Sequence, residues 1–421
     1  MALAATEKLD ARSVIDRPPT AELADVASPP MVPDEIQLAV YDELSAVEQD
    51  WRAFEQQADG TVFQTFDWLS TWQRHIGALN GGRPAIVVGR DVAGGIVFIM
   101  TLSVRPAGFA RELAWLGTEL CDYNAPLLAA GFSERMDRAR FMSLWERVMQ
   151  CLQDHPRLQF DYVNLTKMPE MVGPQKNPML NLHAAMNPNG AYLTHLAGDW
   201  DAFYTAKRSS TTRRRDRTKR KRLAEFGEVK CVNAETESAI LGALDILMTQ
   251  KARLFAHMGV SNLFAKPGHV EFYRAMAAGP TTRHLVHMST LNVGTTPAAV
   301  NLGLTHRDRY YHLLASYDDG EVSRFGPGAA HLHDLLHLAI DRGFRIFDFT
   351  IGDERYKRDW CDTELKLYDS ISSVTWRGAV IATSMLAVQR LKRSIKQAPM
   401  LWNAFSKGRA LIGSLTRLVR R

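Results

Sequence analysis

Apolar residues alternate with polar ones over several short segments of the chain and recur every three or four positions over others. Alternation is typical of a strand, and the longer spacing is typical of an amphipathic helix. Strands and helices follow one another in mixed order, which indicates an α/β fold. The predicted strands cover residues 35–41, 85–89, 95–104, 160–166, 228–233, 284–291, 298–305, 309–318 and 344–350, and the predicted helices cover 44–54, 67–76, 141–152, 213–223, 235–257, 270–277 and 329–343.

The segment from residue 309 to residue 361 carries the most informative pattern. Its first strand, RYYHLLASYD, is largely apolar on both faces, so we expect it in the centre of a sheet. The turn SRFGPG at 323–328 follows, and a helix begins directly after it. Gly343 stands where a glycine ends a helix. A glycine turn that opens a helix presents bare backbone N–H groups, which favours the binding of a phosphate.

The strand at 344–350 is followed by the charged and aromatic segment GDERYKRDW. Side chains of this kind can move protons and hold anions. Together with the glycine turn, they indicate a donor that carries a nucleotide or coenzyme A, and a transfer reaction. A side chain at Gly328 is expected to intrude on that donor or to force an unfavourable turn.

Length and composition indicate the number of domains and the cellular compartment. A chain of 421 residues exceeds a typical domain, so two domains are expected. The four cysteines are scattered without metal-ligand spacing, which indicates free thiols in a reducing cytoplasm. No apolar run approaches the roughly 20 residues that span a bilayer, and the N-terminus lacks the pattern of a signal peptide. We therefore expect a cytoplasmic protein.

The net charge of +5 is modest but unevenly distributed. Residues 207–222 and the C-terminal tail are strongly basic, and no acidic residue follows Asp369. Basic runs neutralise phosphates in nucleic-acid binding, but the run at 207–222 has no aromatic residue to stack on bases and no accompanying motif. We therefore do not expect nucleic acid as a partner. The run could contact donor phosphates, an anionic acceptor or an anionic surface, or be solvated.

These shifts in composition divide the chain into four parts. Residues 1–34 combine Ala, Pro and acidic residues without periodicity, which predicts a disordered leader. Residues 35–195 and 196–376 are two α/β halves of similar size, which suggests a duplicated fold. Residues 377–421 form a basic tail.

The tail at 377–421 has apolar residues at roughly helical spacing, interspersed with lysine and arginine. A basic amphipathic helix with a tryptophan, here Trp402, is typical of a segment that lies in an anionic membrane surface. The alternative is a helix that docks on the protein's own core. The first interpretation predicts a cytoplasmic protein in peripheral contact with the inner membrane.

The order of these motifs resembles the GNAT acyltransferases. The relevant segments are SRFGPG with its helix, GFRIFDFTIGDERYKRDW, FQTFDWLSTW at 63–72 and the arginine-rich run at 213–223. The likeness covers roughly residues 35–376 and is closest to the CelD-like branch of cellulose and exopolysaccharide biosynthesis, which is related to FemAB-type peptidyltransferases. It implies two GNAT-like lobes of mixed sheet flanked by helices. One departure is Ser323, where the family's phosphate loop usually has Gln or Arg.

The resemblance also implies roles for residues of the second half. GNAT enzymes often place a group that takes the acceptor's proton where Asp318 stands, although Asp-Asp-Gly is also ordinary turn chemistry. They often place a tyrosine that protonates the departing thiolate where Tyr356 stands, and its alternative role is packing. The donor would contact Arg324, Phe325, Gly326, Gly328 and Ala329.

Three further residues are candidates for contact with the substrate. Asp122 could reach an acceptor group, and its alternative is a turn before proline. Asp348 alternates with two phenylalanines, and a carboxylate there must be paired or near the cleft, because an isolated buried charge is very costly. Lys357 could meet a phosphate or an acidic substrate, and its alternative is a solvated surface lysine.

Two other groups have structural interpretations. His331, His333 and His337 lack a carboxylate or cysteine that would complete a metal site, so we expect no metal and an ordinary helix surface. Trp68 and Trp72, four residues apart, are expected in the core rather than as a sugar platform.

The expected function is that of an N- or O-acyltransferase. It would move an acyl group, in the first place acetyl, from acyl-CoA to an amine or hydroxyl of a carbohydrate or polysaccharide precursor by direct attack. Two alternatives stay open: a FemAB-like transferase that uses aminoacyl-tRNA, and a non-catalytic binding subunit of a polysaccharide biosynthesis complex.

Overall fold

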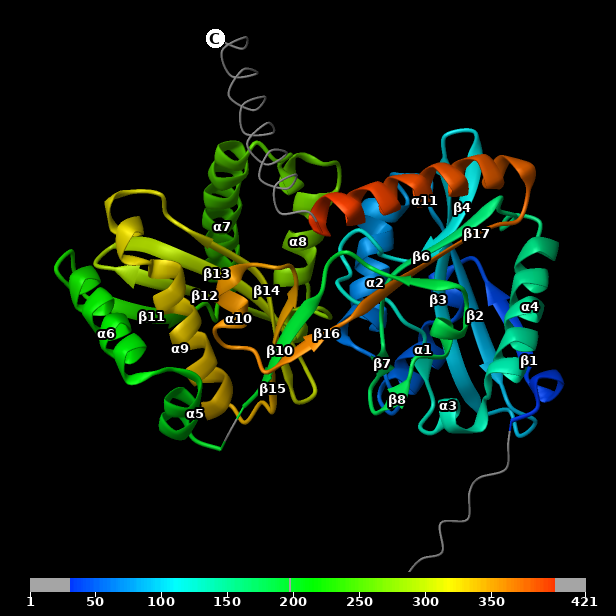
Figure 1. Ribbon diagram of the computed structural model, residues 1–421, viewed down its shortest axis with the longest axis horizontal. Coiled ribbons are helices and arrows are strands. Elements are labelled where there is room, and N and C mark those ends of the chain that lie inside the picture. Colours follow the sequence, from blue (N-terminus) through cyan, green and yellow to red (C-terminus); the bar gives the residue numbers. More distant parts are fainter. Residues whose placement is uncertain (1–30, 197, 398–421) are drawn as a thin grey trace, which may run out of the picture.

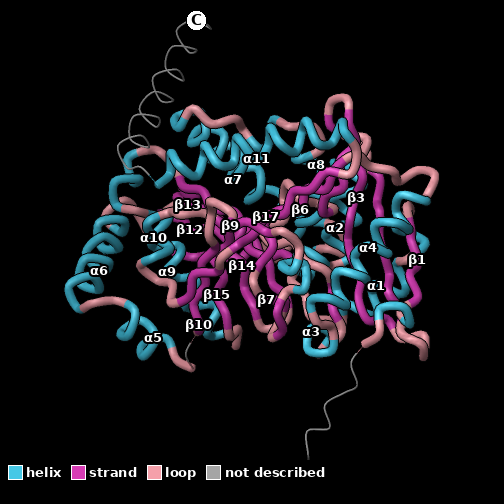
Figure 2. Tube along the Cα trace, turned by 45° about the vertical axis from the view of Figure 1, so that its right-hand side comes forward, coloured by secondary structure: helices cyan, strands magenta, loops and turns pink. Residues whose placement is uncertain are grey.

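A computed structural model describes residues 31–196 and 198–397. Two β-sheets lie side by side, and helices cover both of them (Figure 1). In Figure 2 the strands occupy the centre of the molecule and most helices lie around them. The predicted leader at 1–34 falls almost entirely outside the described residues. The predicted α/β class with two lobes is confirmed.

The first sheet is assembled on the N-terminal half of the chain. Its faces are covered by α1 (Glu48–Glu55), α2 (Phe66–Trp72) with a π-helical extension (Gln73–Gly77), α3 (Phe132–Arg135) and α4 (Arg138–Asp154). A small hairpin of β7 (Met171–Val172) and β8 (Gln175–Lys176) lies apart from it. The strand order is β1 (Gln37–Tyr41), β2 (Arg83–Arg90), β3 (Ile96–Ala107), β4 (Ala110–Trp115), β6 (Tyr162–Pro169), β17 (Leu367–Ser373) and β9 (Ala184–Met186), with β5 (Leu127–Leu128) beside β3.

The second sheet carries the segment that the sequence singled out. Its helices are α5 (Trp200–Lys207), α6 (Ser210–Ala224), α7 (Glu237–Met258), α8 (His269–Ala278), α9 (Pro327–Asp341) and the short α10 (Arg355–Arg358). The strand order is β11 (Val229–Asn233), β12 (Val286–Val293), β13 (Thr296–His306), β14 (Arg309–Tyr317), β15 (Ile346–Ile351), β10 (Ala191–His195) and β16 (Thr363–Leu365).

Both sheets follow the same plan. Four strands pair antiparallel, and the fourth then pairs parallel with the next strand through a helical crossover. The parallel pair is β4 with β6 through α4 in the first sheet, and β14 with β15 through α9 in the second. A parallel pair needs such a crossover because its strands cannot be joined by a tight turn. The shared plan is that of a duplicated fold.

Two strands are exchanged between the lobes. β10 precedes the predicted boundary between 195 and 196 but pairs with β15 and β16 in the second sheet. β17 lies within 196–376 but pairs with β6 and β9 in the first sheet. The predicted boundary at residue 195 therefore does not separate the strands of the two sheets. Backbone pairing, and not sequence order, decides which sheet a strand joins. β17 crosses diagonally between the lobes in Figure 1.

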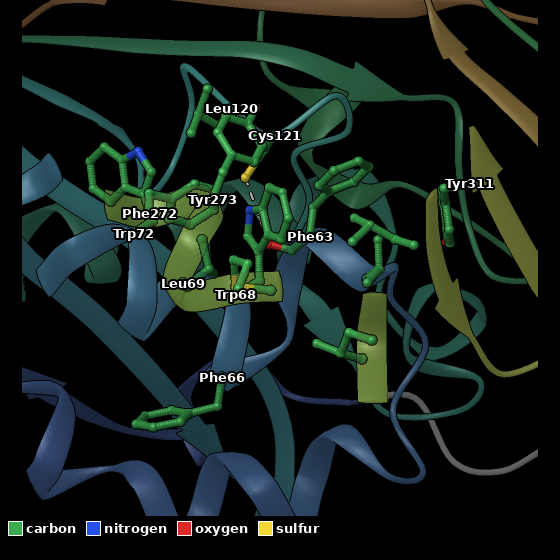
Figure 3. Packing of buried hydrophobic residues seen from close by; sticks show 14 of the residues in the cluster. Phe63, Phe66, Trp68, Leu69, Trp72, Leu120, Cys121, Phe272, Tyr273 and Tyr311 are labelled. Carbon is green, nitrogen blue, oxygen red and sulfur yellow. Dashed lines mark hydrogen bonds between the residues drawn. The ribbon is translucent and has the colours of Figure 1, made fainter. Parts of the chain in front are cut away.

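The lobes also share one hydrophobic core, part of which Figure 3 shows. Trp68 of α2 lies edge-on to Phe272 of α8, with ring centroids 5.0 Å apart. Phe63 lies edge-on to Tyr311 of β14, at 5.7 Å. Trp68 and Trp72 are both buried, so the prediction that they belong to the core is confirmed.

The described part of the predicted tail is a single helix, α11 (Trp376–Gln397). It lies across β4, β6 and β17 of the first sheet, with Gly378 and Ala382 buried against it. A Cβ at Gly378 would overlap the carbonyl oxygen of Asp161, so only glycine allows this close approach. Residues 398–421, with Trp402, lie outside the described residues. Among helices of the described chain, none is both long enough and apolar enough to cross a membrane.

Candidate active site

A wedge opens between β14 and β15 in the middle of the second sheet. The two parallel strands pair only from Arg309 with Ile346 to Tyr311 with Asp348. Beyond that point β14 stays with β13, and β15 stays with β10. Leu313 lies where β14 has separated from β15, two residues after Tyr311. It is only partly buried, although β14 is a central strand. The wedge therefore leaves backbone groups of the strand edges available to a bound amide or carbonyl.

Thr350 has an unusual backbone conformation beside this wedge. Its φ angle is +59°, which a β-branched residue rarely adopts. The pairing register of β10 against β15 shifts next to it, between Tyr192 and Leu193. Such a conformation costs about 1–3 kcal/mol and persists only where its surroundings hold it. Here the N–H of Thr350 donates to Asp348 Oδ1 at 2.8 Å.

Asp348 is the fully buried carboxylate that ties the two lobes together. Its Oδ1 accepts the hydroxyl of Tyr123 from the first lobe at 2.7 Å, and its Oδ2 accepts Arg309 Nη1 at 3.1 Å. Burial raises the pKa of Asp348, and Arg309 with the other donors opposes the rise. The expectation that a carboxylate here must be paired is confirmed. With both oxygens engaged, Asp348 positions its neighbours rather than taking a proton.

Asp122 lies at the same junction, one residue before Tyr123, and is half-buried. Burial raises its pKa, while the Lys167 charge, a hydrogen bond with Thr350 and the Lys357 charge oppose the rise. Lys167 fixes the loop before Asp122, since its Nζ donates to the carbonyl oxygens of Thr118 at 3.0 Å and Cys121 at 2.8 Å. A half-buried carboxylate with a raised pKa is suited to accept a proton.

Lys357 is buried, with 3% of its surface exposed. Its Nζ contacts the carbonyl oxygens of Ile351 at 2.8 Å and Thr350 at 3.3 Å, and Glu354 Oε2 at 2.9 Å. An ammonium has three protons to donate, and these three acceptors engage them all. The solvated-lysine alternative is therefore wrong. The three predicted substrate residues, Asp122, Asp348 and Lys357, meet around Thr350.

Two side chains near Glu354 can donate protons at this junction. Tyr356 is 38% exposed on α10, and its partly enclosed position raises its pKa above the usual value. Lys251 of α7 was not predicted. Burial lowers the pKa of Lys251, the charge of Glu354 opposes this, and the charge of Lys357 adds to it. Nothing in the sequence around Lys251 indicates a proton donor, because only the fold brings Lys251 near Glu354 and Lys357.

Asp318 lies at the far end of β14 and is engaged locally. Its Oδ2 accepts the N–H of Gly320 at 3.1 Å, and its Oδ1 is 3.7 Å from Arg253 Nη1. β14 runs seven residues from Tyr311, where it leaves β15, to Asp318, and a strand rises about 3.3 Å per residue. Asp318 therefore lies roughly 20 Å along β14 from the point where β14 leaves β15, and its contacts are those of a turn.

The glycine turn before α9 is more self-contained than its sequence indicates. Gly326 has a φ of +70° and its carbonyl oxygen accepts the N–H groups of Ala329 and Ala330, both at 3.1 Å. The N–H of Gly326 donates to Ser323 at 3.0 Å. The guanidinium of Arg324 lies 4.8 Å from the ring centre of Phe325, and the Arg324 side chain is 65% exposed.

Gly328 is less constrained than expected. Its φ is not positive, and a Cβ there would meet only Tyr317, at 3.6 Å. The expected unfavourable turn at Gly328 is therefore wrong, and the glycine that the backbone requires is Gly326. Lys219 of α6 lies beside the N-terminal end of α9, since its Nζ is 3.7 Å from the position that a Cβ of Gly326 would take. The basic run and the glycine turn thus meet in space.

The three histidines of α9 have different surroundings. His331 is buried, with its Nε2 3.0 Å from Ser289 Oγ, and burial lowers its pKa to about 4. The expected surface position is therefore wrong for His331. His333 and His337 pack on Trp200, with ring centroids 4.6 and 4.8 Å away. Across the residues described, no three His, Cys, Asp or Glu side chains gather as metal ligands.

Replacing Gly326 by alanine is expected to destabilise the protein by about 1–2 kcal/mol, the cost of a left-handed conformation for an L-residue. Gly328→Ala is the matched control. It should be neutral or slightly stabilising, because its Cβ has room and alanine favours a helix. Urea unfolding of both variants measures the difference. A larger loss of stability in Gly328→Ala would show that this turn is assigned wrongly.

Comparison with known proteins agrees with this geometry. Residues 210–358 match the family model of the acetyltransferase (GNAT) domain. This part of the chain carries a GNAT-type acetyltransferase domain. The matched residues include α6, the wedge, the glycine turn, Thr350 and Lys357. No curated protein matches the sequence.

Several solved structures are similar over most of the chain. FemX has 9% identity and a TM-score of 0.53, with 78% of this chain and 96% of FemX covered. A conserved protein of unknown function from Bacteroides thetaiotaomicron VPI-5482 has 12% identity and a TM-score of 0.48, with 79% and 99% covered. A tandem GNAT protein from the clavulanic acid biosynthesis pathway has 12% identity and a TM-score of 0.45, with 80% and 98% covered.

At these identities the structural likeness concerns the fold. The GNAT match and the two-lobed fold support acyltransferase activity.

Proposed function

We propose that the protein transfers an acyl group, in the first place acetyl, from acyl-CoA to an amine or hydroxyl of a carbohydrate or polysaccharide precursor. One observation carries the proposal. Asp122 of the first lobe meets the β14–β15 wedge of the GNAT-type domain, beside the strained Thr350 and the buried Lys357. A proton acceptor from one lobe thereby faces the opening in the other lobe that could hold the donor's thioester.

The chemistry requires one proton acceptor and one proton donor. The acceptor's nitrogen or oxygen attacks the thioester carbonyl carbon, and Asp122 takes the proton that this atom loses. The carbon–sulfur bond then breaks, and the thiolate takes a proton from Tyr356 or Lys251. The lowered pKa of Lys251 makes its proton easier to release near neutral pH than that of Tyr356, whose pKa is raised.

The fold supplies position and polarity for this reaction. Backbone groups at the parted edges of β14 and β15 can hold the thioester carbonyl, as preorganised donors do for a developing oxyanion. Asp348 fixes the junction, because it bonds Tyr123 of one lobe and Arg309 of the other. Holding both reactants in one geometry reduces the entropic part of the barrier.

The acceptor class comes from the family resemblance described above. A precursor assembled at a membrane would suit an enzyme with a basic tail, and the predicted peripheral contact of the tail at 377–421 with an anionic inner membrane is part of this proposal.

Two alternatives have a specific observation each. A FemAB-like transferase that uses aminoacyl-tRNA is favoured by the exposed cations of α6 and by the likeness to FemX in fold. A non-catalytic binding subunit is favoured by the glycine turn, where the N–H groups of Ala329 and Ala330 already bond to Gly326.

Acceptor-dependent release of free thiol from acetyl-CoA tests the proposal directly. The purified protein should release thiol when amino sugars or saccharide precursors are added, and the product should gain the mass of one acetyl group. A parallel reaction with aminoacyl-tRNA separates the first alternative. Donor binding without turnover across the acceptor panel would favour the binding subunit, and no binding of acyl-CoA would contradict the proposal.

A further inference from the structure

One end of the first sheet is marked by a row of paired residues across its strands. The row consists of Arg83, Val104, Leu113, Val163 and Ser372, on β2, β3, β4, β6 and β17. Neighbouring strands lie about 4.8 Å apart, so this row spans roughly 19 Å. Figure 1 shows the turn between β3 and β4 and the start of α11 at this end, along the upper edge of the first lobe.

Large apolar side chains are exposed at this end. In the described chain, the four most exposed are Val92 at 74%, Trp376 at 73%, Leu79 at 65% and Phe109 at 59%. Three of these lie at this end: Leu79 shortly before β2, Phe109 in the turn between β3 and β4, and Trp376 at the first residue of α11. Val380, 53% exposed, lies one helical turn after Trp376 on the same side of α11. Isolated apolar residues at a surface are ordinary, but a group of them at one edge indicates an interaction surface.

A hollow of about 370 Å³ lies among the segments that carry Leu79 and Phe109. Its lining consists of Gly81, Arg83, Val104, Arg105, Pro106, Arg111 and Arg157. A Cβ at Gly81 would stand 3.2 Å from Pro106, so the loop before β2 closely approaches the end of β3. Four arginines therefore meet in one hollow, and none of the described residues that line it is acidic.

Part of the charge in this hollow is already balanced. Arg105 pairs with Glu112 at 2.5 Å and with Glu119 at 2.6 Å, and Arg157 pairs with Asp42. These pairs join neighbouring segments of the lobe, and they hold the walls of the hollow in place.

Three other arginines at this end, Arg83, Arg111 and Arg377, have no carboxylate partner in the described chain. Arg111 Nη2 donates to the backbone carbonyl oxygen of Arg157 at 2.7 Å. The guanidinium of Arg377 lies 5.7 Å from the ring centre of Trp376. Unpaired cations of this kind attract a partner with negative charge.

Asp161 fixes the start of α11 against this end of the sheet. Its carbonyl oxygen accepts the N–H of Val374 at 2.8 Å. Its carboxylate accepts the N–H of Arg111 at 2.8 Å and the hydroxyl of Thr375 at 2.6 Å. Trp376 follows directly, so its side chain is exposed while its backbone is held in place. A side chain on an ordered backbone loses less freedom when it binds a partner.

Exposed apolar side chains beside unpaired cations are typical of a surface that binds anionic lipid. A soluble anion would account for the arginines but would leave Leu79, Phe109 and Trp376 in water. A second copy of the chain would bring the same unpaired cations against one another, because a twofold interface pairs one patch with itself. An anionic bilayer matches both the charge and the apolar side chains.

We propose that this end of the first lobe docks on an anionic lipid bilayer. Leu79, Phe109 and Trp376 enter the interface of the bilayer, and the phosphate of a lipid headgroup lies in the hollow against Arg83 and Arg111. The contact is made by the folded first lobe, so it stands whether or not the basic tail binds. It goes beyond the proposed function, because docking does not require that an acyl group is transferred.

Co-sedimentation of the full-length protein with vesicles tests the apolar contact. The vesicles consist of equal parts of phosphatidylglycerol and phosphatidylcholine, and the salt concentration is low. Phe109→Asp should weaken binding roughly tenfold or more, because an aromatic side chain no longer enters the bilayer and a negative charge faces the lipid. Val92→Asp is the matched control, because it changes an exposed apolar residue in the turn between β2 and β3, at the opposite end of the sheet. Its binding should stay within about twofold of the wild type. Equal losses in the two variants would overturn the assignment of this end.

The hollow is tested with Arg83→Ala/Arg111→Ala. Loss of two cations near an anionic surface should weaken vesicle binding roughly tenfold or more. Arg138→Ala/Lys176→Ala is the matched control, because it removes the same charge far from the hollow. Arg138 begins α4 just after α3, Lys176 ends β8, and Figure 1 shows α3 and β8 at the lower edge of the first lobe. The control should bind within about twofold of the wild type, and circular dichroism checks that every variant is folded. An equal loss in both double variants would contradict the headgroup contact.

Other occupants of this surface give different results. A dimer in sedimentation velocity that Phe109→Asp converts to a monomer would make a second copy the partner and overturn the proposal. Binding of uridine diphosphate that Arg83→Ala/Arg111→Ala abolishes, with vesicle binding unchanged, would make the hollow a site for a soluble anion. Wild-type protein that does not bind the vesicles would also overturn docking. Thiol release from acetyl-CoA without vesicles should be the same in all variants, so a failure of docking is distinguishable from a failure of the proposed function.

Discussion

Asp122→Asn is expected to lower kcat for acyl transfer by about 10²–10⁴-fold, the usual contribution of a general base. Asparagine keeps the shape of the side chain but cannot accept the acceptor's proton. Donor affinity should change little, because the predicted donor contacts lie at the glycine turn before α9. Steady-state kinetics with acetyl-CoA and a saccharide acceptor, together with calorimetry of donor binding, measure both quantities.

Asp318→Asn is the matched control for this prediction. It makes the same chemical change at the other candidate carboxylate, which contacts Gly320 and Arg253 at the far end of β14. Its kcat should stay near the wild-type value. A large loss in Asp318→Asn, with normal turnover in Asp122→Asn, would return the role of base to Asp318.

The pH profile separates a base from a merely structural residue. A general base works only when ionised, so kcat should rise with pH through the pKa of Asp122, which burial raises above its ordinary value. This rise in kcat reflects the loss of a proton from the neutral carboxylic acid of Asp122. It should disappear in Asp122→Asn. An unchanged profile in the variant would contradict the assignment.

Trp68→Ala is expected to lower the free energy of unfolding by about 3–5 kcal/mol, the range for truncation of a buried aromatic residue. Trp68 is fully buried and packs on Phe63 of its own lobe and on Phe272 of the other lobe. The loss should affect both lobes, because they share this core. Urea unfolding followed by circular dichroism measures it.

Trp376→Ala is the control for this loss. The same residue type is removed from a position that is 73% exposed on α11. Surface substitutions usually change stability by no more than about 0.5 kcal/mol. If the two variants lose similar stability, or if only the first lobe is weakened by Trp68→Ala, the shared core does not couple the lobes.

Local patterns predicted most elements because the physics that forms them is local. The 3.6-residue spacing of apolar positions placed α7 and α9 within a few residues of their observed ends. Gly343 ends α9 with a φ of +76°, as its position after the last apolar residue indicates. No strand was predicted at β10 or β17, which are short strands whose partners lie on the other half of the chain.

The candidate site was predicted as separate residues rather than as an arrangement. Asp122, Asp348 and Lys357 were each selected for their own charge and neighbours in the chain. Lys251 and the strain at Thr350 were missed. The alternation of Asp348 with phenylalanines correctly indicated that Asp348 is buried. The many charges around Lys357 indicated that this lysine is exposed to solvent, whereas the fold buries it.

The amino-acid sequence by itself determined the α/β class, the two halves, the glycine turn with its helix and the core position of Trp68. Each depends on spacing or on residues close in the chain. Only the tertiary structure decided which strands cross between lobes, which glycine the turn requires, and that Asp122 meets Thr350 and Lys357. These features depend on contacts between residues that are distant in the chain. Such contacts bury charged groups, which changes their pKa values and requires that each has a partner. A local sequence pattern does not contain that information.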